Sequence, residues 1–84
     1  MANKIIIKDI ALSVDVTENT TIQTYIPYDG IDKSKVISTT ITWNNSSNDY
    51  PILCIYYGLP IDRVDHKWSV NQKVRFYIRI SYYN

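Results

Sequence analysis

The segment Lys73–Tyr83, with the sequence KVRFYIRISYY, decides the fold class. Every second residue is apolar or aromatic, and charged or polar residues stand at most of the positions between them. Because successive side chains of a β-strand point to opposite faces, this alternation predicts a strand with one buried and one exposed face. The predicted buried face consists of Val74, Phe76, Ile78, Ile80 and Tyr82, and the other face of Arg75, Tyr77, Arg79, Ser81 and Tyr83.

The chain before this segment repeats the pattern. Alternation of apolar and polar residues predicts strands over Leu12–Val16, Ile22–Ile26 and Lys35–Trp43. The segment Pro51–Tyr57 is apolar at nearly every position, which is typical of a central strand covered on both faces. Ile61–Asp65 is a candidate for a further short strand.

Turn residues separate these strands. Thr17-Glu18-Asn19, Asp29-Gly30 and Gly58-Leu59-Pro60 are all favourable turn sequences. The segment Asn44–Asp49, NNSSND, is too polar to be buried, so we expect it to form an exposed loop tip. Short strands at a spacing of roughly 8–12 residues favour a sandwich or a small barrel.

The composition agrees with an all-β fold. Ile, Val and Thr account for 27 of the 84 residues, whereas Ala and Leu together number five. We therefore predict an antiparallel β-sandwich, jelly-roll-like or immunoglobulin-like, with six to seven strands and no significant helix. Residues 1–84 are predicted to form a single domain, with residues 1–10 as an additional edge strand or as a docking segment.

Charge and cysteine content exclude several kinds of site. Nine basic and eight acidic residues give a net charge of +1, which offers no general attraction to nucleic acid. One Cys excludes an internal disulfide, and one His excludes a multi-histidine metal site. The pairs Asp29/Asp32 and Asp62/Asp65 supply fewer oxygens than a calcium loop does. We expect no cofactor and no bound metal.

The sequence also predicts that the protein does not insert into a membrane. The run Ile5-Ile6-Ile7 is too short for the apolar core of a signal peptide. No stretch approaches the ~20 apolar residues that a membrane-spanning helix needs. We therefore expect neither a signal peptide nor a transmembrane segment.

His66 and Cys54 are the side chains whose chemistry is best suited to catalysis. A carboxylate such as that of Asp65 can orient an imidazole as a general base, and a cysteine can then act as the nucleophile. The sequence has no glycine-rich oxyanion loop and no second base. We expect His66 to be an exposed hairpin residue, Cys54 to be a small buried core residue, and the protein not to be an enzyme.

Taken in order, the predicted segments form a characteristic series. The series comprises a Ser-Val-x-Val strand (Ser13–Val16), a Thr/Asn-rich turn (Thr17–Thr21), a strand that ends in a glycine turn (Ile22–Gly30), a strand that ends in an aromatic residue (Lys35–Trp43), an Asn/Ser-rich loop (Asn44–Asp49) and a long final strand (Val74–Tyr83). Over residues 8–84 this order resembles the small C-terminal modules of bacteriophage tail fibres and head fibres. The resemblance implies a jelly-roll-like sandwich that forms trimers and binds host-surface carbohydrate or decorates the particle. Unlike those fibres, the sequence contains no coiled-coil or shaft pattern, which leaves the mode of attachment open.

The resemblance leads to the main functional hypothesis, a non-enzymatic structural or adhesion module of a phage-like particle. It predicts a virion location, contacts with other virion proteins and a homo-oligomer, with a trimer favoured. A small domain with a two-faced apolar strand gains stability when it buries one face against its own copies. The predicted oligomer interface consists of Ile52, Cys54, Tyr56, Phe76, Ile78 and Tyr82.

A carbohydrate ligand is expected at the loop tips. The rings of Tyr50 and Trp68 would stack on the apolar C–H face of a sugar, while the amides of Asn45 and Asn48 would bond to its hydroxyl groups.

Two other functions are alternatives. A small β protein of this kind can act in the host cytoplasm as an inhibitor that binds a host protein. It can also bind single-stranded nucleic acid through Arg75, Tyr77 and Arg79, a function that the near-neutral net charge disfavours.

Overall fold

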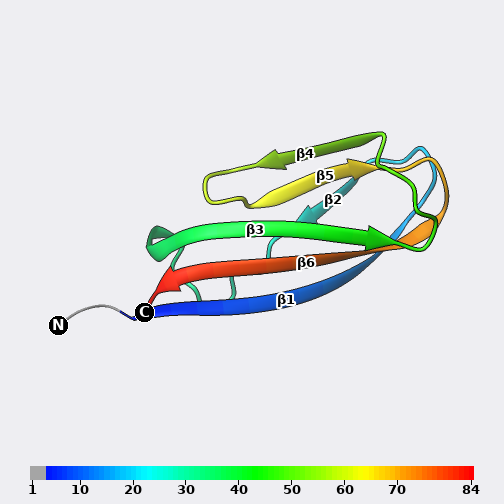
Figure 1. Ribbon diagram of the computed structural model, residues 1–84. Coiled ribbons are helices and arrows are strands. Elements are labelled where there is room, and N and C mark those ends of the chain that lie inside the picture. Colours follow the sequence, from blue (N-terminus) through cyan, green and yellow to red (C-terminus); the bar gives the residue numbers. More distant parts are fainter. Residues whose placement is uncertain (1–3) are drawn as a thin grey trace.

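The computed structural model describes residues 4–84 as two three-stranded antiparallel sheets that face each other (Figure 1). The long sheet has the order β1-β6-β3, with β1 at Ile5–Val16, β6 at Gln72–Tyr83 and β3 at Val36–Asn45. The short sheet has the order β2-β5-β4, with β2 at Ile22–Tyr25, β5 at Arg63–Lys67 and β4 at Leu53–Tyr57. A single 3-10 turn, η1 at Lys33–Lys35, precedes β3. The predicted all-β class is confirmed.

Strand β6 is the centre of the long sheet, as its alternation leads one to expect. It pairs along its whole length with β1, from Ile5 opposite Tyr83 to Val16 opposite Gln72, and on its other side with β3. Its inner side chains, Val74, Phe76, Ile78 and Ile80, are buried against the short sheet. The prediction that Phe76 and Ile78 lie in an oligomer interface is therefore wrong, because the core of the single chain already covers both side chains.

The first strand is longer than predicted. The run Ile5–Ile7 is not a separate element but the start of β1, which continues without interruption to Val16. Residues 5–10 thus belong to an edge strand of the long sheet. Next to the end of this strand, the N–H of Asn84 donates to the carbonyl of Lys4, and the N–H of Lys4 donates to the side-chain oxygen of Asn84. The docking segment proposed for residues 1–10 lies partly outside the described residues.

In the short sheet the central strand is β5, although the composition of the two segments suggests that β4 is central and β5 peripheral. The prediction that Pro51–Tyr57 forms a covered central strand is wrong, because β4 is an edge strand and its residues Ile55, Tyr56 and Tyr57 are 39%, 44% and 41% exposed. The central strand is β5, although it carries Arg63 and Asp65. Their charges compensate each other on the outer face, where the Arg63 Nε lies 2.8 Å from the Asp65 carboxylate.

The turns agree with the sequence signals. Asn19 and Gly30 both have positive φ, which Asn tolerates and Gly adopts freely, and each follows an acidic residue in a tight turn. The N–H of Ile31 closes the second turn on the carbonyl of Tyr28 at 2.9 Å. Tyr28 itself is buried, and its hydroxyl lies 2.5 Å from the carbonyl of Ile61 and 2.8 Å from the hydroxyl of Thr39. This side chain joins the long sheet to the start of β5.

A histidine lies in the middle of the core. His66 is fully buried, whereas an exposed hairpin residue was predicted, so that prediction is wrong. The Nε1–H of Trp68 donates to its Nδ1 at 2.8 Å, and its Nε2–H therefore donates to the hydroxyl of Thr24 at 2.7 Å. The imidazole also packs edge-on against Phe76, with a centroid distance of 4.9 Å. Both ring nitrogens are satisfied only in the neutral form, and burial lowers the pKa of His66 below its ordinary value of 6.5, although Asp65 partly opposes this.

His66 should make folding stability depend on pH. Since the folded chain binds the His66 proton less readily than the unfolded chain, the unfolded state takes up more protons below pH 6.5. The urea midpoint should therefore be constant above about pH 7 and fall as the pH decreases to about 5.5, a window that lies above the usual range of carboxyl titrations. The variant His66→Gln, whose amide can make both hydrogen bonds without titrating, should lose this slope. An equal slope in the variant would show that other groups cause it.

Candidate functional site

Three connections meet at one end of the sandwich. The links from β1 to β2, from β3 to β4 and from β5 to β6 all lie at the right-hand end in Figure 1. Hydrogen bonds hold them together: the hydroxyl of Ser69 donates to the Asp49 carboxylate at 3.1 Å, and that of Ser47 donates to Gln72 at 2.7 Å. The polar loop predicted over Asn44–Asp49 is thus anchored to the neighbouring loop.

Aromatic rings form a column from the core to the surface at this end. Trp68 is 1% exposed, and Trp43 packs edge-on against it with a centroid distance of 5.0 Å. Tyr50 packs edge-on against Trp43 at 6.4 Å and is itself 84% exposed. The outermost ring therefore presents most of its surface to solvent while its base rests on a half-buried indole.

Polar side chains surround the outer ring of this column. A shallow hollow of about 200 Å³ is lined by what we call the loop-tip platform: Trp43, Asn44, Asn45, Asn48, Asp49 and Tyr50. The amide of Asn45 donates to the carbonyl of Asp49 at 2.7 Å, which fixes the turn of the loop. Asn48 adopts a left-handed backbone with φ of 57° and is exposed. It presents its amide beside the hollow.

A second hollow adjoins the platform and is basic. It has a volume of about 530 Å³ and shares three asparagines with the platform; its lining is Asn44, Asn45, Ser46, Asn48, Lys73 and Arg75. Lys73 lies 3.7 Å from the exposed Asp15, and the Nε of Arg75 donates to the hydroxyl of Ser13 at 3.3 Å. Of the three arginines, Arg75 is the one without a carboxylate partner within the described chain.

The structure brings together three of the four residues predicted to bind a ligand. Tyr50, Asn45 and Asn48 line one hollow, but Trp68 lies in the core and its ring is closed to any ligand, so its prediction is wrong. The sequence pattern did not reveal Trp43, which takes the place beside Tyr50. Its position at the end of an alternating strand, directly before the polar loop, is the signal that could have identified it.

The residues predicted to form an oligomer interface are dispersed. Phe76 and Ile78 are in the core, and Tyr82 lies half-buried near the other end of β6. Ile52, Cys54 and Tyr56 lie on or beside the edge strand β4, where Ile52 and Tyr56 are exposed. Cys54 is half-buried rather than fully buried as predicted.

Cys54 and His66 do meet in the fold, as cross-strand neighbours on the inner face of the short sheet. The two nitrogens of His66 are engaged with Trp68 and Thr24, so the imidazole is not free to accept a proton from a thiol. Burial, together with Cys54, raises the pKa of Tyr56 to about 12. Cys54 therefore lies beside Tyr56 and His66 without forming a nucleophile–base pair.

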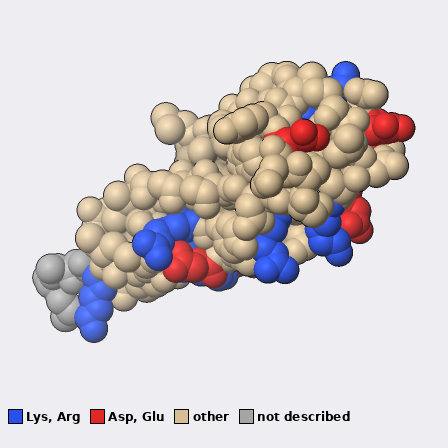
Figure 2. All heavy atoms as spheres, turned by 45° about the vertical axis from the view of Figure 1, so that its right-hand side comes forward, with Lys and Arg blue, Asp and Glu red and all other residues tan. Residues whose placement is uncertain are grey.

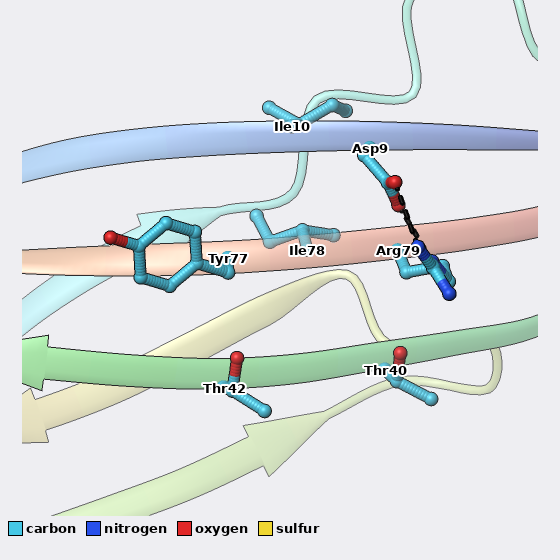
Figure 3. Close-up of a pocket in the computed structure, with 7 residues that line it drawn as sticks. All are labelled: Asp9, Ile10, Thr40, Thr42, Tyr77, Ile78 and Arg79. Atoms are coloured by element: carbon cyan, nitrogen blue, oxygen red, sulfur yellow. Dashed lines mark hydrogen bonds and ion pairs between the residues drawn. The ribbon is translucent and has the colours of Figure 1, made fainter.

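The outer face of the long sheet carries paired charges. Figure 3 shows Asp9, Thr40, Thr42, Tyr77 and Arg79 around a depression of about 350 Å³ on this sheet. The guanidinium of Arg79 donates two hydrogen bonds to the carboxylate of Asp9, at 2.7 and 2.9 Å, and so holds the pKa of that carboxyl below its ordinary value. In Figure 2 both signs of charge intersperse along the lower side of the molecule. Because Asp9 compensates Arg79, only Arg75 among Arg75, Tyr77 and Arg79 carries a charge without an acidic partner in the described chain, which gives little support to the several phosphate contacts of a nucleic-acid site.

Within residues 4–84 no group of three or more His, Cys, Asp and Glu side chains is placed to hold a metal ion. The same part of the chain contains no helix with the length and hydrophobicity needed to cross a bilayer. Comparison with known proteins gave no match, whether to a family model, to the sequences of curated proteins or to solved structures.

Substitutions at the two ends of the aromatic column should differ greatly in their effect on stability. Trp68→Ala removes the largest fully buried side chain together with the hydrogen bond to His66, and should lower the free energy of unfolding by about 3–5 kcal/mol. Tyr50→Ala should change it by no more than about 0.5 kcal/mol, because the ring is exposed. Urea denaturation followed by tryptophan fluorescence measures both. Equal losses would contradict the division between core and surface.

Proposed function

We propose that the protein is a non-enzymatic adhesion module that binds carbohydrate at the loop-tip platform. The observation that carries the proposal is the Tyr50 ring, which is 84% exposed, supported from below by Trp43, and bordered by asparagine amides. The combination of an exposed ring, a second ring beneath it and polar groups at its border matches the amphipathic surface of a sugar.

The chemistry of the platform suits a sugar. The C–H groups of a pyranose form an apolar face that packs on an aromatic ring, and its hydroxyl groups bond to amides and carboxylates at the rim. Tyr50 provides the ring, Asn48 provides an amide, and Asp49 provides acceptor oxygens. The hollow of about 200 Å³ lies below the ~300–1,000 Å³ typical of enclosed small-molecule pockets and fits surface contact with one or two sugar rings.

The adjoining basic hollow suggests the class of sugar. Arg75 and Lys73 lie on the side of the polar loop that Asn44, Asn45 and Asn48 share with the platform. If one sugar ring binds at Tyr50 and the polysaccharide continues along this loop, the substituents of the adjacent sugar rings would lie next to Lys73 and Arg75. A carboxylate or sulfate group would pair with Arg75, whose guanidinium has no carboxylate partner in the described chain. The proposed ligand is therefore an acidic polysaccharide.

A glycan array tests the carbohydrate proposal. The native protein should bind a set of glycans that is enriched in carboxylated or sulfated members. Tyr50→Ala should weaken binding to all of them by about tenfold or more, because stacking and the buried area of the ring are lost together. Arg75→Gln should weaken binding to the acidic glycans selectively and reduce its dependence on salt concentration, with Lys73 accounting for the remainder.

Two control variants match these substitutions. Tyr25→Ala removes another exposed tyrosine, on the outer face of the short sheet, and Arg79→Gln removes an arginine that is already paired with Asp9. Neither should change binding. Absence of binding on the array, or binding that Tyr50→Ala leaves unchanged, would refute the carbohydrate proposal.

The particle context rests on the resemblance to phage fibre modules. We propose that the module is displayed on a phage-like virion, and mass spectrometry of purified particles tests this location. A virion component should be present in a fixed ratio to the other particle proteins. If the protein occurs in infected cells but is missing from particles, the intracellular inhibitor becomes the better account.

A further inference from the structure

The two sheets leave four strand edges unpaired within the described chain: those of β1, β3, β2 and β4. A free edge offers backbone N–H and C=O groups to any other strand, and proteins commonly protect such edges with charges, bulges or short length. The four edges can therefore be compared by the protection that each carries.

Three of the edges are protected. Strand β1 carries Lys8, Asp9 and Asp15. Strand β3 has a bulge between Val36 and Ser38. Its outward side chains are polar, namely Ser38, Thr40, Thr42 and Asn44. Strand β2 is only four residues long.

The edge of β4 is also short, at five residues, but it carries neither charges nor a bulge. The sequence from Tyr50 to Ile61 contains no charged residue, and the strand Leu53–Tyr57 pairs with β5 without a shift of register. Ile52, Ile55, Tyr56 and Tyr57 are all exposed. An unprotected edge with apolar side chains is the kind that accepts another strand.

We propose that β4 pairs antiparallel with β4 of a second copy of this chain, with Ile55 opposite Ile55 on a two-fold axis. This inference does not depend on the carbohydrate proposal. It replaces the predicted packing of strand faces with a pairing of strand edges, and it joins two short sheets into one sheet of six strands.

The register explains why the occupant is a second copy. With Ile55 on the axis, Leu53 faces Tyr57 of the other copy and Cys54 faces Tyr56 of the other copy. Every cross-strand pair joins apolar or aromatic side chains, and no two like charges meet. Since the strand is complementary to itself in this register, a two-fold symmetric dimer satisfies both edges at once.

Five paired residues make a small interface, so the association should be weak and depend on concentration. Sedimentation velocity over a series from micromolar to millimolar protein should show a mass that rises from 9.8 kDa toward twice that value. Ile55→Lys places two lysines on the axis and should keep the protein monomeric throughout the series. Ile7→Lys is the matched control, because Ile7 is similarly exposed but lies on the long sheet, and it should leave the dimer intact.

A cysteine cross-link tests the register directly. In a Cys54→Ser background, Ile55→Cys places one cysteine of each copy on the two-fold axis. The two Cα atoms should then lie about 4.5–5.5 Å apart, a distance that a disulfide spans. Oxidation should then yield a covalent dimer on a non-reducing gel. Cys54→Ser with Leu53→Cys should remain mostly uncrosslinked, because Leu53 of each copy faces Tyr57 of the other.

The outcomes separate the possible assemblies. A monomer at all concentrations overturns the proposal. So does a mass of three chains, which is the assembly implied by the resemblance to fibre modules, since a two-fold axis cannot produce it. Loss of association in Ile7→Lys but not in Ile55→Lys would place the interface at the apolar end of the long sheet instead.

Discussion

The packing of β6 against the centre of the short sheet is the contact on which the rest of the structure depends. Two three-stranded sheets have little area to bury, so the few large side chains between them must meet closely. Phe76 from the long sheet and Trp68 from the link after β5 fill this space with His66, which belongs to the short sheet. The imidazole is polar, but its bonds to Trp68 and Thr24 satisfy both nitrogens. A buried polar ring is tolerated there because it also fixes the orientation of the indole.

This central contact extends to the surface at the loop end. Trp43 rests on Trp68, and Tyr50 rests on Trp43, so the exposed ring inherits its position from the core. A ligand-binding ring held by packed rings loses little conformational freedom on binding, which favours affinity. The stability of the core and the geometry of the platform are thus linked through a single column of aromatic side chains.

The sequence predicts the strands well where one face is buried and the other exposed. β6 shows this alternation over most of its length, β3 follows it, and β1 follows it over Leu12–Val16 but not over its first residues, Ile5-Ile6-Ile7. The pattern fails for the short sheet, where composition suggests a central β4 and an exposed His66. Placement in that sheet depends on pairing between distant residues: Asp65 compensates Arg63 within β5, and Trp68 and Thr24 satisfy His66. The same limit explains why Trp68 was predicted to line the ligand site that Trp43 lines in the structure. Alternation alone reveals neither how deeply a side chain is buried nor which side chains surround it.

The edge of β4 and the loop-tip platform are adjacent in sequence, and this constrains how they can act together. Tyr50 immediately precedes the segment that leads into β4, so the platform lies at the starting end of that strand. In an antiparallel pair the starting ends of the two strands point in opposite directions. Two copies joined along β4 would therefore carry their platforms at opposite ends of the six-stranded sheet. Such a dimer is suited to bridging two polysaccharide chains, whereas binding one flat surface through both sites would require a different symmetry.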